Sequence, residues 1–321
     1  MPESHLLQNI DLVILAGGKG TRIKELLGKY PKPMIKLNKK HFMQYLLNST
    51  SKFNFKRIII LCGYRHKIFF EKYNKKLKNL TEIVCIKENK LLGTGGALFN
   101  LKKMNVRDFV LINGDTIFNL NLNSLILNLK KNKIGIIALT KNIKQKSKKL
   151  SNLSLKKNSL YFKENSTMMN GGVYFFNSKI FKYIKKKECS LENEILPKLI
   201  KKNMIQGKFF NNFFIDIGSK QYFKIAKNKL KNEFYKAAVF LDRDGVINYD
   251  YGYVHKIKNF DLRDGVIQGL RYLIKKNYYI FIITNQAGIG KKIYKKNDFI
   301  KLHKNINEKF KKNNIFIDDV Q

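Results

Sequence analysis

The sequence predicts an α/β protein with a mostly parallel β-sheet, followed by a second, shorter α/β unit. Short apolar runs such as Leu12–Leu15 and Arg57–Cys62 (RIIILC) are too short for buried helices and indicate buried strands. Segments with helical spacing separate these runs, and such alternation favours a parallel sheet covered on both faces. A new strand–helix–strand series starts at Ala237 (AAVFLDRDGVIN). We therefore expect one domain over residues 1–235 and another over residues 236–321.

The first strand runs directly into a glycine-rich loop (AGGKGTR, residues 16–22), after which apolar residues recur at helical spacing. A glycine-rich bend between a strand and a helix lets several backbone N–H groups face an anion, and the helix start adds its positive end. Arg22 and Lys32 supply full charges nearby. The loop therefore predicts a polyphosphate site that is formed by these residues: Ala16, Gly17, Gly18, Gly20 and Thr21.

This loop differs from the two common phosphate-binding loops. A Walker loop needs Ser or Thr after the Gly-Lys pair, whereas Gly20 follows Lys19 here. A dinucleotide fingerprint needs its third glycine two residues after the second, and Arg22 departs from that spacing. A different class of phosphate-binding protein is therefore indicated.

The remaining elements continue the alternation. Strands are expected at Glu82–Lys87, Asp108–Ile112, Ile134–Thr140, Met168–Phe176 and Phe213–Gly218, and helices at His41–Leu47, Lys67–Leu77, Ser190–Lys201 and Gln221–Tyr235. In the second unit we expect the helix Val266–Lys275 and the strands Tyr279–Ile283 and Ile315–Val320. Ligands of such sheets gather at the carboxyl ends of the strands. The glycine loop, the GTGG segment at 93–96 and Asp115 are all expected there.

Downstream of the glycine loop, Tyr30-Pro31-Lys32-Pro33-Met34 holds a lysine between two prolines. The pairing of GGxGTR with PKPM resembles the hallmark of the sugar-1-phosphate nucleotidyltransferase family. The resemblance covers residues 8–228 and implies a Rossmann-like nucleotidyltransferase domain with a mostly parallel sheet. Within the family, LGTGGAL, NGGVY and SLENEILP are most similar to D-glycero-α-D-manno-heptose-1-phosphate guanylyltransferases.

The reaction that this resemblance implies is an in-line attack of a sugar phosphate on the α-phosphorus of a nucleoside triphosphate. The attacking phosphate is already ionised at neutral pH, so the protein has mainly to position and neutralise negative groups. The resemblance assigns the triphosphate to Arg22 and the reacting phosphates to Lys32. It also makes Asp115 (NGD) and Asp216 (IDIG) the expected Mg²⁺ ligands, in keeping with the preference of Mg²⁺ for carboxylates and substrate phosphates.

Recognition of the base is assigned to Glu88, which precedes the GTGG segment by a few residues. A carboxylate can accept both N1–H and N2–H of guanine, a donor pair that the other bases lack, so we favour GTP. The alternative, in which Glu88 is a solvated strand end, stays open. The nucleotide-binding residues that the resemblance implies are those of the glycine loop (Ala16, Gly17, Gly18, Gly20 and Thr21) together with Gly93, Thr94, Gly95 and Gly96.

On the sugar side, the resemblance implies binding by Asn170, Gly171, Gly172 and Glu192. One departure concerns Phe162-Lys163-Glu164-Asn165, where the family usually has Phe-x-Glu-Lys. Asn165 stands at the position of a lysine near the sugar phosphate, which leaves Lys163 as its substitute.

The second unit places Asp242 and Asp244 two residues apart at a strand end, and Thr284 and Asn285 follow the next strand. In a phosphatase the first carboxylate attacks phosphorus and the second protonates the leaving alkoxide. With TNQAGIG and YGYVHKIKNF, the pattern resembles the D,D-heptose bisphosphate phosphatase branch of the haloacid dehalogenase (HAD) superfamily. The resemblance implies that Thr284 and Asn285 bind the phosphoryl group and that Asp242 and Asp244 take part in a Mg²⁺ site.

Two features expected of that branch are missing before Gln321: a later lysine and acid, and a cysteine-rich zinc loop. We therefore expect a truncated HAD-like domain that does not hydrolyse phosphate esters efficiently. Removal of the 7-phosphate from heptose 1,7-bisphosphate would give the substrate of the first domain, so the two halves together favour heptose.

The formal net charge is +41, but the lysines are spread along the chain with abundant Asn and Ile. We attribute the charge to composition and expect no specific nucleic-acid partner. No apolar run spans a bilayer, and three scattered cysteines form no metal-type pair, so a reduced, cytoplasmic protein is expected. The open alternatives are mannose 1-phosphate with GTP, glucose 1-phosphate with dTTP, and a non-catalytic basic binding protein. A monomer and a homo-oligomer both stay open.

Overall fold

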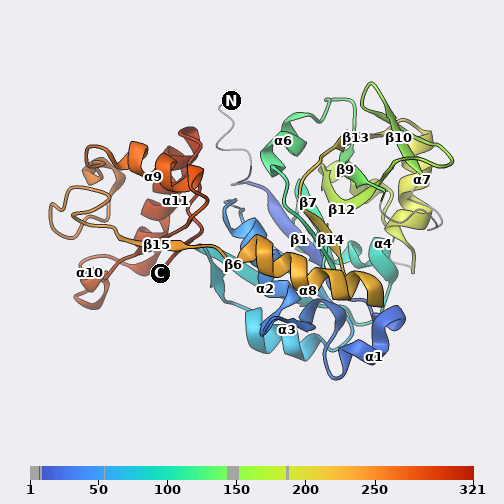
Figure 1. Cartoon of the computed structure of the whole chain (residues 1–321), viewed down its shortest axis with the longest axis horizontal. Coiled ribbons are helices and arrows are strands. Elements are labelled where there is room, and N and C mark those ends of the chain that lie inside the picture. The colour runs from blue at the N-terminus through green and yellow to red at the C-terminus, as the bar shows by residue number, and fades with distance from the viewer. Residues whose placement is uncertain (1–6, 8, 54, 143–151, 186–187) are drawn as a thin grey trace.

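A computed structural model describes residues 7, 9–53, 55–142, 152–185 and 188–321 of the chain. Its main feature is a ten-stranded sheet with the order β10-β11-β13-β9-β12-β7-β1-β4-β6-β5, flanked by helices (Figure 1). A smaller sheet, β15-β16-β17, lies apart from it in the C-terminal part of the chain. The predicted α/β class and the second α/β unit are both confirmed.

The centre of the main sheet is parallel, as predicted. β7 (Phe109–Asn113), β1 (Asp11–Leu15), β4 (Ile58–Cys62) and β6 (Thr81–Lys87) pair in parallel. Alternate residues of β1 enter different cores: Leu12 and Ile14 belong to one, and Val13 to the other. This burial on both faces explains why the strands read as continuous apolar runs.

The flanks of the sheet contain antiparallel pairs that the strand–helix alternation did not predict. The long strand β12 (Met168–Phe176) runs antiparallel to both β7 and β9. The other flanking strands are β9 (Gly135–Lys141), β13 (Ile205–Phe209), β10 (Leu153–Lys156), β11 (Ser159–Phe162) and β5 (Leu77–Lys78). A separate hairpin pairs β2 (Lys36–Leu37) with β3 (Lys40–His41).

The helices of the first part are mostly short: α1 (Lys24–Leu27), α2 (Phe42–Ser51), α3 (His66–Tyr73), α4 (Gly93–Ala97), α5 (Phe99–Lys102), α6 (Leu122–Leu127), α7 (Leu196–Lys201) and α8 (Lys220–Phe234). The helix predicted to reach Leu77 ends at Tyr73, because the chain turns there and Leu77 joins β5. The helix predicted from Ser190 begins as a π-helix at Leu191–Ile195. None of the helices in the described ranges is long and apolar enough to cross a membrane.

One short antiparallel pair joins distant parts of the chain. β8 (Thr116–Phe118) follows β7 directly, and β14 (Phe214–Asp216) precedes α8. The pairing sets Asp216 opposite Thr116, and the N–H of Ile217 donates to the carbonyl of Asp115 at 3.0 Å. Two segments about a hundred residues apart thereby meet beside the carboxyl end of β7.

The C-terminal part has its own parallel sheet of β15 (Ala238–Asp242), β16 (Tyr279–Ile283) and β17 (Asp319–Val320). Its helices are α9 (Val266–Lys275), α10 (Ala287–Gly290) and α11 (Lys296–Lys312). The sequence analysis missed α11, and the strand predicted over Ile315–Val320 shrinks to its last two residues. A separate core that includes Ile280, Leu302 and Phe310 holds these elements together.

The C-terminal sheet is attached to the first part through Asn79, which is 4% exposed. The Asn79 side chain donates from Nδ2 to the carbonyls of Ser51 (2.7 Å) and Ile317 (3.2 Å), while its backbone N–H donates to Asp319 Oδ1 at 3.0 Å. Lys78 forms an ion pair with Asp319 at 2.7 Å. Each of these hydrogen bonds and the ion pair requires its two partners to meet in one arrangement, so the attachment is specific in its geometry.

We predict that Asn79→Ala loosens this attachment, because it leaves the carbonyls of Ser51 and Ile317 without their buried donor. The free energy of opening should fall by about 1–3 kcal/mol. Hydrogen exchange of β17 and its neighbours, followed by mass spectrometry, measures that opening. Asn105→Ala is the matched control, since Asn105 also has a positive φ (52°) but lies exposed away from this contact. Equal exchange in the two variants would contradict the prediction.

Candidate active site

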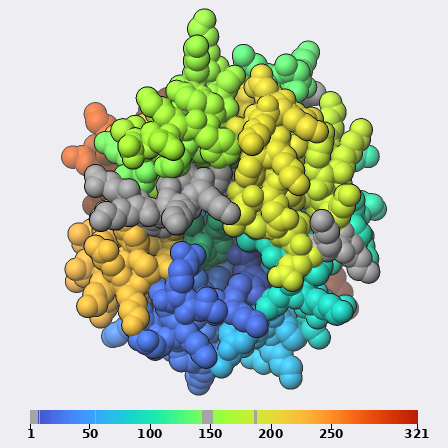
Figure 2. Space-filling model, turned by 90° about the vertical axis from the view of Figure 1, so that its right-hand side faces the viewer, coloured from blue at the N-terminus to red at the C-terminus, as the bar shows by residue number. Residues whose placement is uncertain are grey.

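A cavity of about 500 Å³ opens where the central parallel strands end. Figure 2 shows the hollow between the N-terminal segment and the segments coloured green to yellow. The structure brings most of the predicted residues of the first domain into its wall, although they come from positions 16 to 216 of the sequence. These are Ala16, Gly17, Gly18, Gly20, Thr21, Arg22, Lys32, Glu88, Gly93, Thr94, Asp115, Asn170, Gly171, Gly172, Glu192 and Asp216.

The glycine loop forms the floor of the cavity next to β1. Gly20 takes a left-handed conformation (φ 66°), which a residue with a side chain adopts at a cost. The predicted helix after the loop is reduced to a 3₁₀ turn (Thr21–Ile23) and the four-residue α1, because Gly28 also has a positive φ and a proline follows soon after. So short a helix contributes little dipole. An anion at this loop would therefore be held by backbone N–H groups and nearby cations, with little contribution from a helix dipole.

Lys32 supplies one of these cations from a rigid position. It begins a 3₁₀ turn (Lys32–Met34) between Pro31 and Pro33, and it is only 9% exposed. Its ammonium group donates a hydrogen bond to the carboxylate of Asp115, with which it forms an ion pair. The burial of a lysine is tolerated here because the opposite charge lies against it.

Asp115 and Asp216 line the same cavity, because the pairing of β8 with β14 brings them to one edge. The carboxylate of Asp216 also accepts a hydrogen bond from the N–H of Gly218, which fixes its direction. Two aspartates facing a common space, with room for substrate phosphates, match the hard-oxygen donor set that Mg²⁺ prefers. In the described ranges, no cluster of three or more His, Cys, Asp or Glu residues adds a further metal site.

Glu88 is buried beside the glycine loop at the end of β6. Its carboxylate lies so close to Gly17 that a side chain at that position would collide with it. Burial raises the pKa of Glu88 to about 7, although the backbone N–H of Leu92 partly opposes this. The alternative that Glu88 is merely a solvated strand end is wrong, because its exposure is 8%. Among the residues that the structure describes, no cation forms an ion pair with Glu88, so its carboxyl group is available to a ligand with N–H donors.

Three of the residues predicted to bind the sugar, Asn170, Gly171 and Gly172, come from a bulge in β12, whereas Glu192 lies in the π-helix at Leu191–Ile195. The register of β12 against β9 shifts between Asn170 and Tyr174, and Gly172 there has a φ of 67°. The N–H of Gly172 donates to Asn170 Oδ1 at 2.9 Å. The bulge thus turns the NGG segment into the cavity, opposite the glycine loop. Lys163, proposed as a substitute for the family lysine, is exposed and does not line the cavity.

Two predicted nucleotide-binding residues have another role in this structure. Gly95 and Gly96 are buried in α4, and their N–H groups donate to the carbonyl of Cys189 at 3.0 and 3.4 Å. Neither lines the cavity. These glycines instead let α4 approach the segment at 189–195, because a side chain at Gly95 would meet Cys189 and Ile195.

The sequence analysis missed several residues of the wall. Asn113, the last residue of β7, and Thr116 both line the cavity near Asp115, as do Leu91, Phe214 and Gly218. Asn113 stands in the NGD segment, so its place at a strand end was a usable signal. The buried hydroxyl of Tyr174, which contacts the wall from behind, carried no such signal because the residue lies in an apolar strand.

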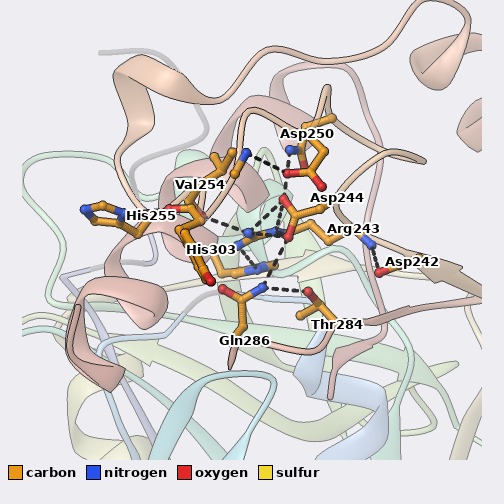
Figure 3. A network of polar contacts seen from close by, with 12 residues as sticks. Asp242, Arg243, Asp244, Asp250, Val254, His255, Thr284, Gln286 and His303 are labelled. Atoms are coloured by element: carbon orange, nitrogen blue, oxygen red, sulfur yellow. Dashed lines mark hydrogen bonds and ion pairs between the residues drawn. The ribbon is translucent and has the colours of Figure 1, made fainter. Parts of the chain in front are cut away.

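A second group of predicted residues lies in the C-terminal part, away from this cavity. Figure 3 shows Asp244 held by the guanidinium group of Arg243, with Nη2 at 2.8 and 2.6 Å from its two carboxylate oxygens. Asn248 and Gln286 donate to the same carboxylate at 3.0 and 3.3 Å. Arg243 is 1% exposed and also donates to the carbonyl of Val254. The carboxylate of Asp244 is therefore surrounded by donors.

The other predicted residues of this group are more open. The carboxylate of Asp242 accepts from the N–H of Arg243 at 2.7 Å, and Thr284 accepts from Gln286 at 2.7 Å, while Asn285 is exposed.

The small C-terminal sheet has an exposed aromatic face. Phe240, which stacks on Phe281, is 65% exposed. One face of this parallel sheet thus presents aromatic rings to solvent, whereas parallel sheets are normally covered on both faces.

Comparisons with known proteins agree with the larger site. Residues 12–152 match the nucleotidyl transferase family. The D-glycero-α-D-manno-heptose 1-phosphate guanylyltransferase of Campylobacter jejuni is 29% identical over 213 residues, which is 64% of this chain and 93% of that protein. The crystal structure of HddC from Yersinia pseudotuberculosis complexed with GMP-PN is 29% identical. The structural alignment covers 69% of this chain and all of the HddC chain, with a TM-score of 0.58.

The C-terminal part has its own relatives. The D-glycero-α-D-manno-heptose-1,7-bisphosphate 7-phosphatase of Campylobacter jejuni is 48% identical over 83 residues, which is 26% of this chain. Those residues make up 48% of the phosphatase, so this chain spans about half the length of that relative.

Proposed function

Since this chain is a nucleotidyltransferase, we propose that it transfers GMP from GTP to D-glycero-D-manno-heptose 1-phosphate and releases pyrophosphate. The observation that carries this proposal is the common cavity: cations, two aspartates, a base-reading carboxyl group and the NGG bulge face one space. The similarity to heptose-1-phosphate guanylyltransferases supports the choice of both substrates. The phosphatase-like C-terminal part supports heptose independently.

The cavity suits the reaction because its main task is to collect negative charge in a fixed geometry. Arg22 and the glycine loop would bind the triphosphate, and Lys32 would neutralise the phosphates that react. Asp115 and Asp216 would hold Mg²⁺, which when bound adds positive charge beside those phosphates. No side chain has to remove a proton, because the attacking sugar phosphate is already ionised. The protein accelerates the reaction by placing that oxygen in line with the α-phosphorus.

The choice of GTP rests on Glu88. In its ionised form the carboxylate accepts from both N1–H and N2–H of guanine, whereas adenine has no such edge. A base that leaves this buried group unpaired is penalised. Mannose 1-phosphate with GTP and glucose 1-phosphate with dTTP remain the alternative substrate pairs, and a non-catalytic basic binding protein remains the alternative of another class.

We further propose that the chain consists of two domains, at residues 1–235 and 236–321. The separate sheet of the C-terminal part supports this division, as does its hydrophobic core, which also includes Leu80 of the first part. For that part we propose a phosphatase-like site with low activity. Asp244, the residue expected to donate a proton, already accepts hydrogen bonds from Arg243, Asn248 and Gln286.

The first prediction concerns the substrate pair. GTP with the heptose 1-phosphate should release pyrophosphate faster than any other pair drawn from five nucleoside triphosphates and heptose, mannose and glucose 1-phosphates.

A related prediction concerns Asp115. Asp115→Asn should lower kcat/KM by about 10²-fold or more, because it removes charge next to the reacting phosphates. Asp108→Asn, a change at the opposite end of β7, is the matched control and should keep full activity. Equal pyrophosphate release by the Asp115 and Asp108 variants would contradict the role proposed for Asp115, and no release by the unmodified protein with any pair would support the non-catalytic alternative.

A second prediction uses the pKa of Glu88. Because that pKa is about 7 in the free protein, the carboxylate becomes ionised as the pH rises through 7. The ratio of GTP affinity to ATP affinity should therefore rise from pH 5.5 to 8, whereas ionisation of the triphosphate affects both nucleotides alike. Glu88→Gln should abolish this pH dependence and reduce the preference by about 1–3 kcal/mol. A ratio that is flat with pH in the unmodified protein would show that Glu88 does not read the base.

A third prediction concerns the phosphatase-like part. With heptose 1,7-bisphosphate, this chain should release inorganic phosphate at a rate close to that of its Asp242→Asn variant. A continuous phosphate assay measures both rates. Turnover well above the Asp242→Asn background would contradict the proposed low activity.

A further inference from the structure

Glu192 is held in the cavity wall by hydroxyl groups from three segments. Thr94 Oγ1 donates to Glu192 Oε2 at 2.5 Å, and Ser190 Oγ reaches the same oxygen at 3.4 Å. Tyr174 Oη reaches the other oxygen, Oε1, at 3.5 Å. A carboxylate has about four acceptor positions, so these three donors leave capacity for a ligand hydroxyl. The orientation of Glu192 is therefore set by its neighbours before any ligand binds.

The direction of the Thr94 hydrogen bond is fixed by chemistry. The backbone N–H of Leu191 can only donate, and it lies 2.9 Å from Thr94 Oγ1. The single hydroxyl proton of Thr94 is therefore left for Glu192, which as a carboxylate can only accept. Thr94 belongs to α4, the segment assigned to the nucleotide, whereas Glu192 belongs to the sugar side. This hydroxyl directly joins the two halves of the site.

The backbone around Thr94 prevents the two segments from sliding. The N–H of Gly95 donates to the carbonyl of Cys189 at 3.0 Å, and the N–H of Cys189 donates to the carbonyl of Leu92 at 2.9 Å. A side chain at Gly93 would lie 2.5 Å from the Cys189 carbonyl. The nucleotide segment and the Glu192 segment thus form one rigid unit.

Tyr174 makes the corresponding link to β12. Its side chain is fully buried, and its hydroxyl accepts from Asn170 Nδ2 at 2.7 Å. The amide nitrogen can only donate, so the phenolic proton is free to point at Glu192. Burial and the charge of Glu192 raise the pKa of Tyr174 well above its usual value, which keeps that proton in place.

We propose that Thr94 and Tyr174 are positioning residues that act through Glu192. They fix the sugar-binding carboxylate relative to the nucleotide segment on one side and to Asn170 on the other. Since the reaction needs the sugar phosphate in line with the α-phosphorus, a small displacement of Glu192 lowers the rate. This inference rests on the proposed transferase function. Neither residue needs to touch the reacting atoms with its hydroxyl group.

The test is a double-mutant cycle in which kcat/KM for the sugar phosphate is measured for variants of Thr94, Tyr174 and Glu192. Tyr174→Phe removes only a buried hydroxyl, and Thr94→Val removes a hydroxyl at nearly constant volume, whereas Thr94→Ser retains it. Tyr174→Phe and Thr94→Val should each lower kcat/KM for the sugar phosphate about tenfold, with a smaller effect on the KM for GTP. Thr94→Ser should recover most of the activity that Thr94→Val loses. Tyr183→Phe, which removes a hydroxyl near Met204, is the matched control and should change neither constant.

The decisive step repeats the changes in a Glu192→Gln background. If Tyr174 and Thr94 act through the carboxylate, their losses should largely disappear there, whereas a merely structural role would add the same loss in both backgrounds. Additive losses, or a Thr94→Ser variant as impaired as Thr94→Val, would overturn the inference. The cycle is measured with whichever sugar phosphate and nucleotide the chain turns over fastest. A pair other than GTP with heptose 1-phosphate would correct the proposed function alone and leave this inference standing.

Discussion

The ion pair of Lys32 with Asp115 is the interaction on which the rest of the site depends. A lysine that is only 9% exposed needs an opposite charge beside it, and the carboxylate of Asp115 supplies that charge. Pro31 and Pro33 fix the lysine, and β7 delivers the aspartate at its carboxyl end. The pairing of β8 with β14 then adds Asp216 to the same edge. A set of opposite charges is thereby assembled where a triphosphate and a sugar phosphate can displace some contacts and gain others.

The two parts of the chain are attached on a side remote from the large cavity. The contact of Asn79 with Ser51, Ile317 and Asp319 joins them near β5. The cavity opens at the carboxyl ends of the central strands and lies on a different face (Figures 1 and 2). Under the proposed functions, an intermediate that leaves the phosphatase-like part would therefore reach the transferase cavity through solvent. The attachment fixes orientation and does not bring the two sites together.

The sequence predicted the parts of the fold that depend on local pattern. Buried runs such as Leu12–Leu15 and Met168–Phe176 became strands, and motifs at strand ends became the cavity wall. Two features depended on contacts between distant segments and could not be predicted from local pattern. The antiparallel direction of β12 follows from its pairing with β7 and β9. Gly95 and Gly96 serve close packing against Cys189. Hydroxyl groups in apolar strands, such as that of Tyr174, also give no periodic signal.

The most direct test of the central claim is the binding of Mn²⁺, as a substitute for Mg²⁺, in the presence of GTP by electron paramagnetic resonance. The account predicts that the unmodified protein binds a nucleotide-dependent Mn²⁺ ion. Asp115→Asn and Asp216→Asn should each weaken that binding strongly, because both carboxylates face the same cavity. Full Mn²⁺ binding by the Asp216→Asn variant would contradict the claim that the two aspartates form one site.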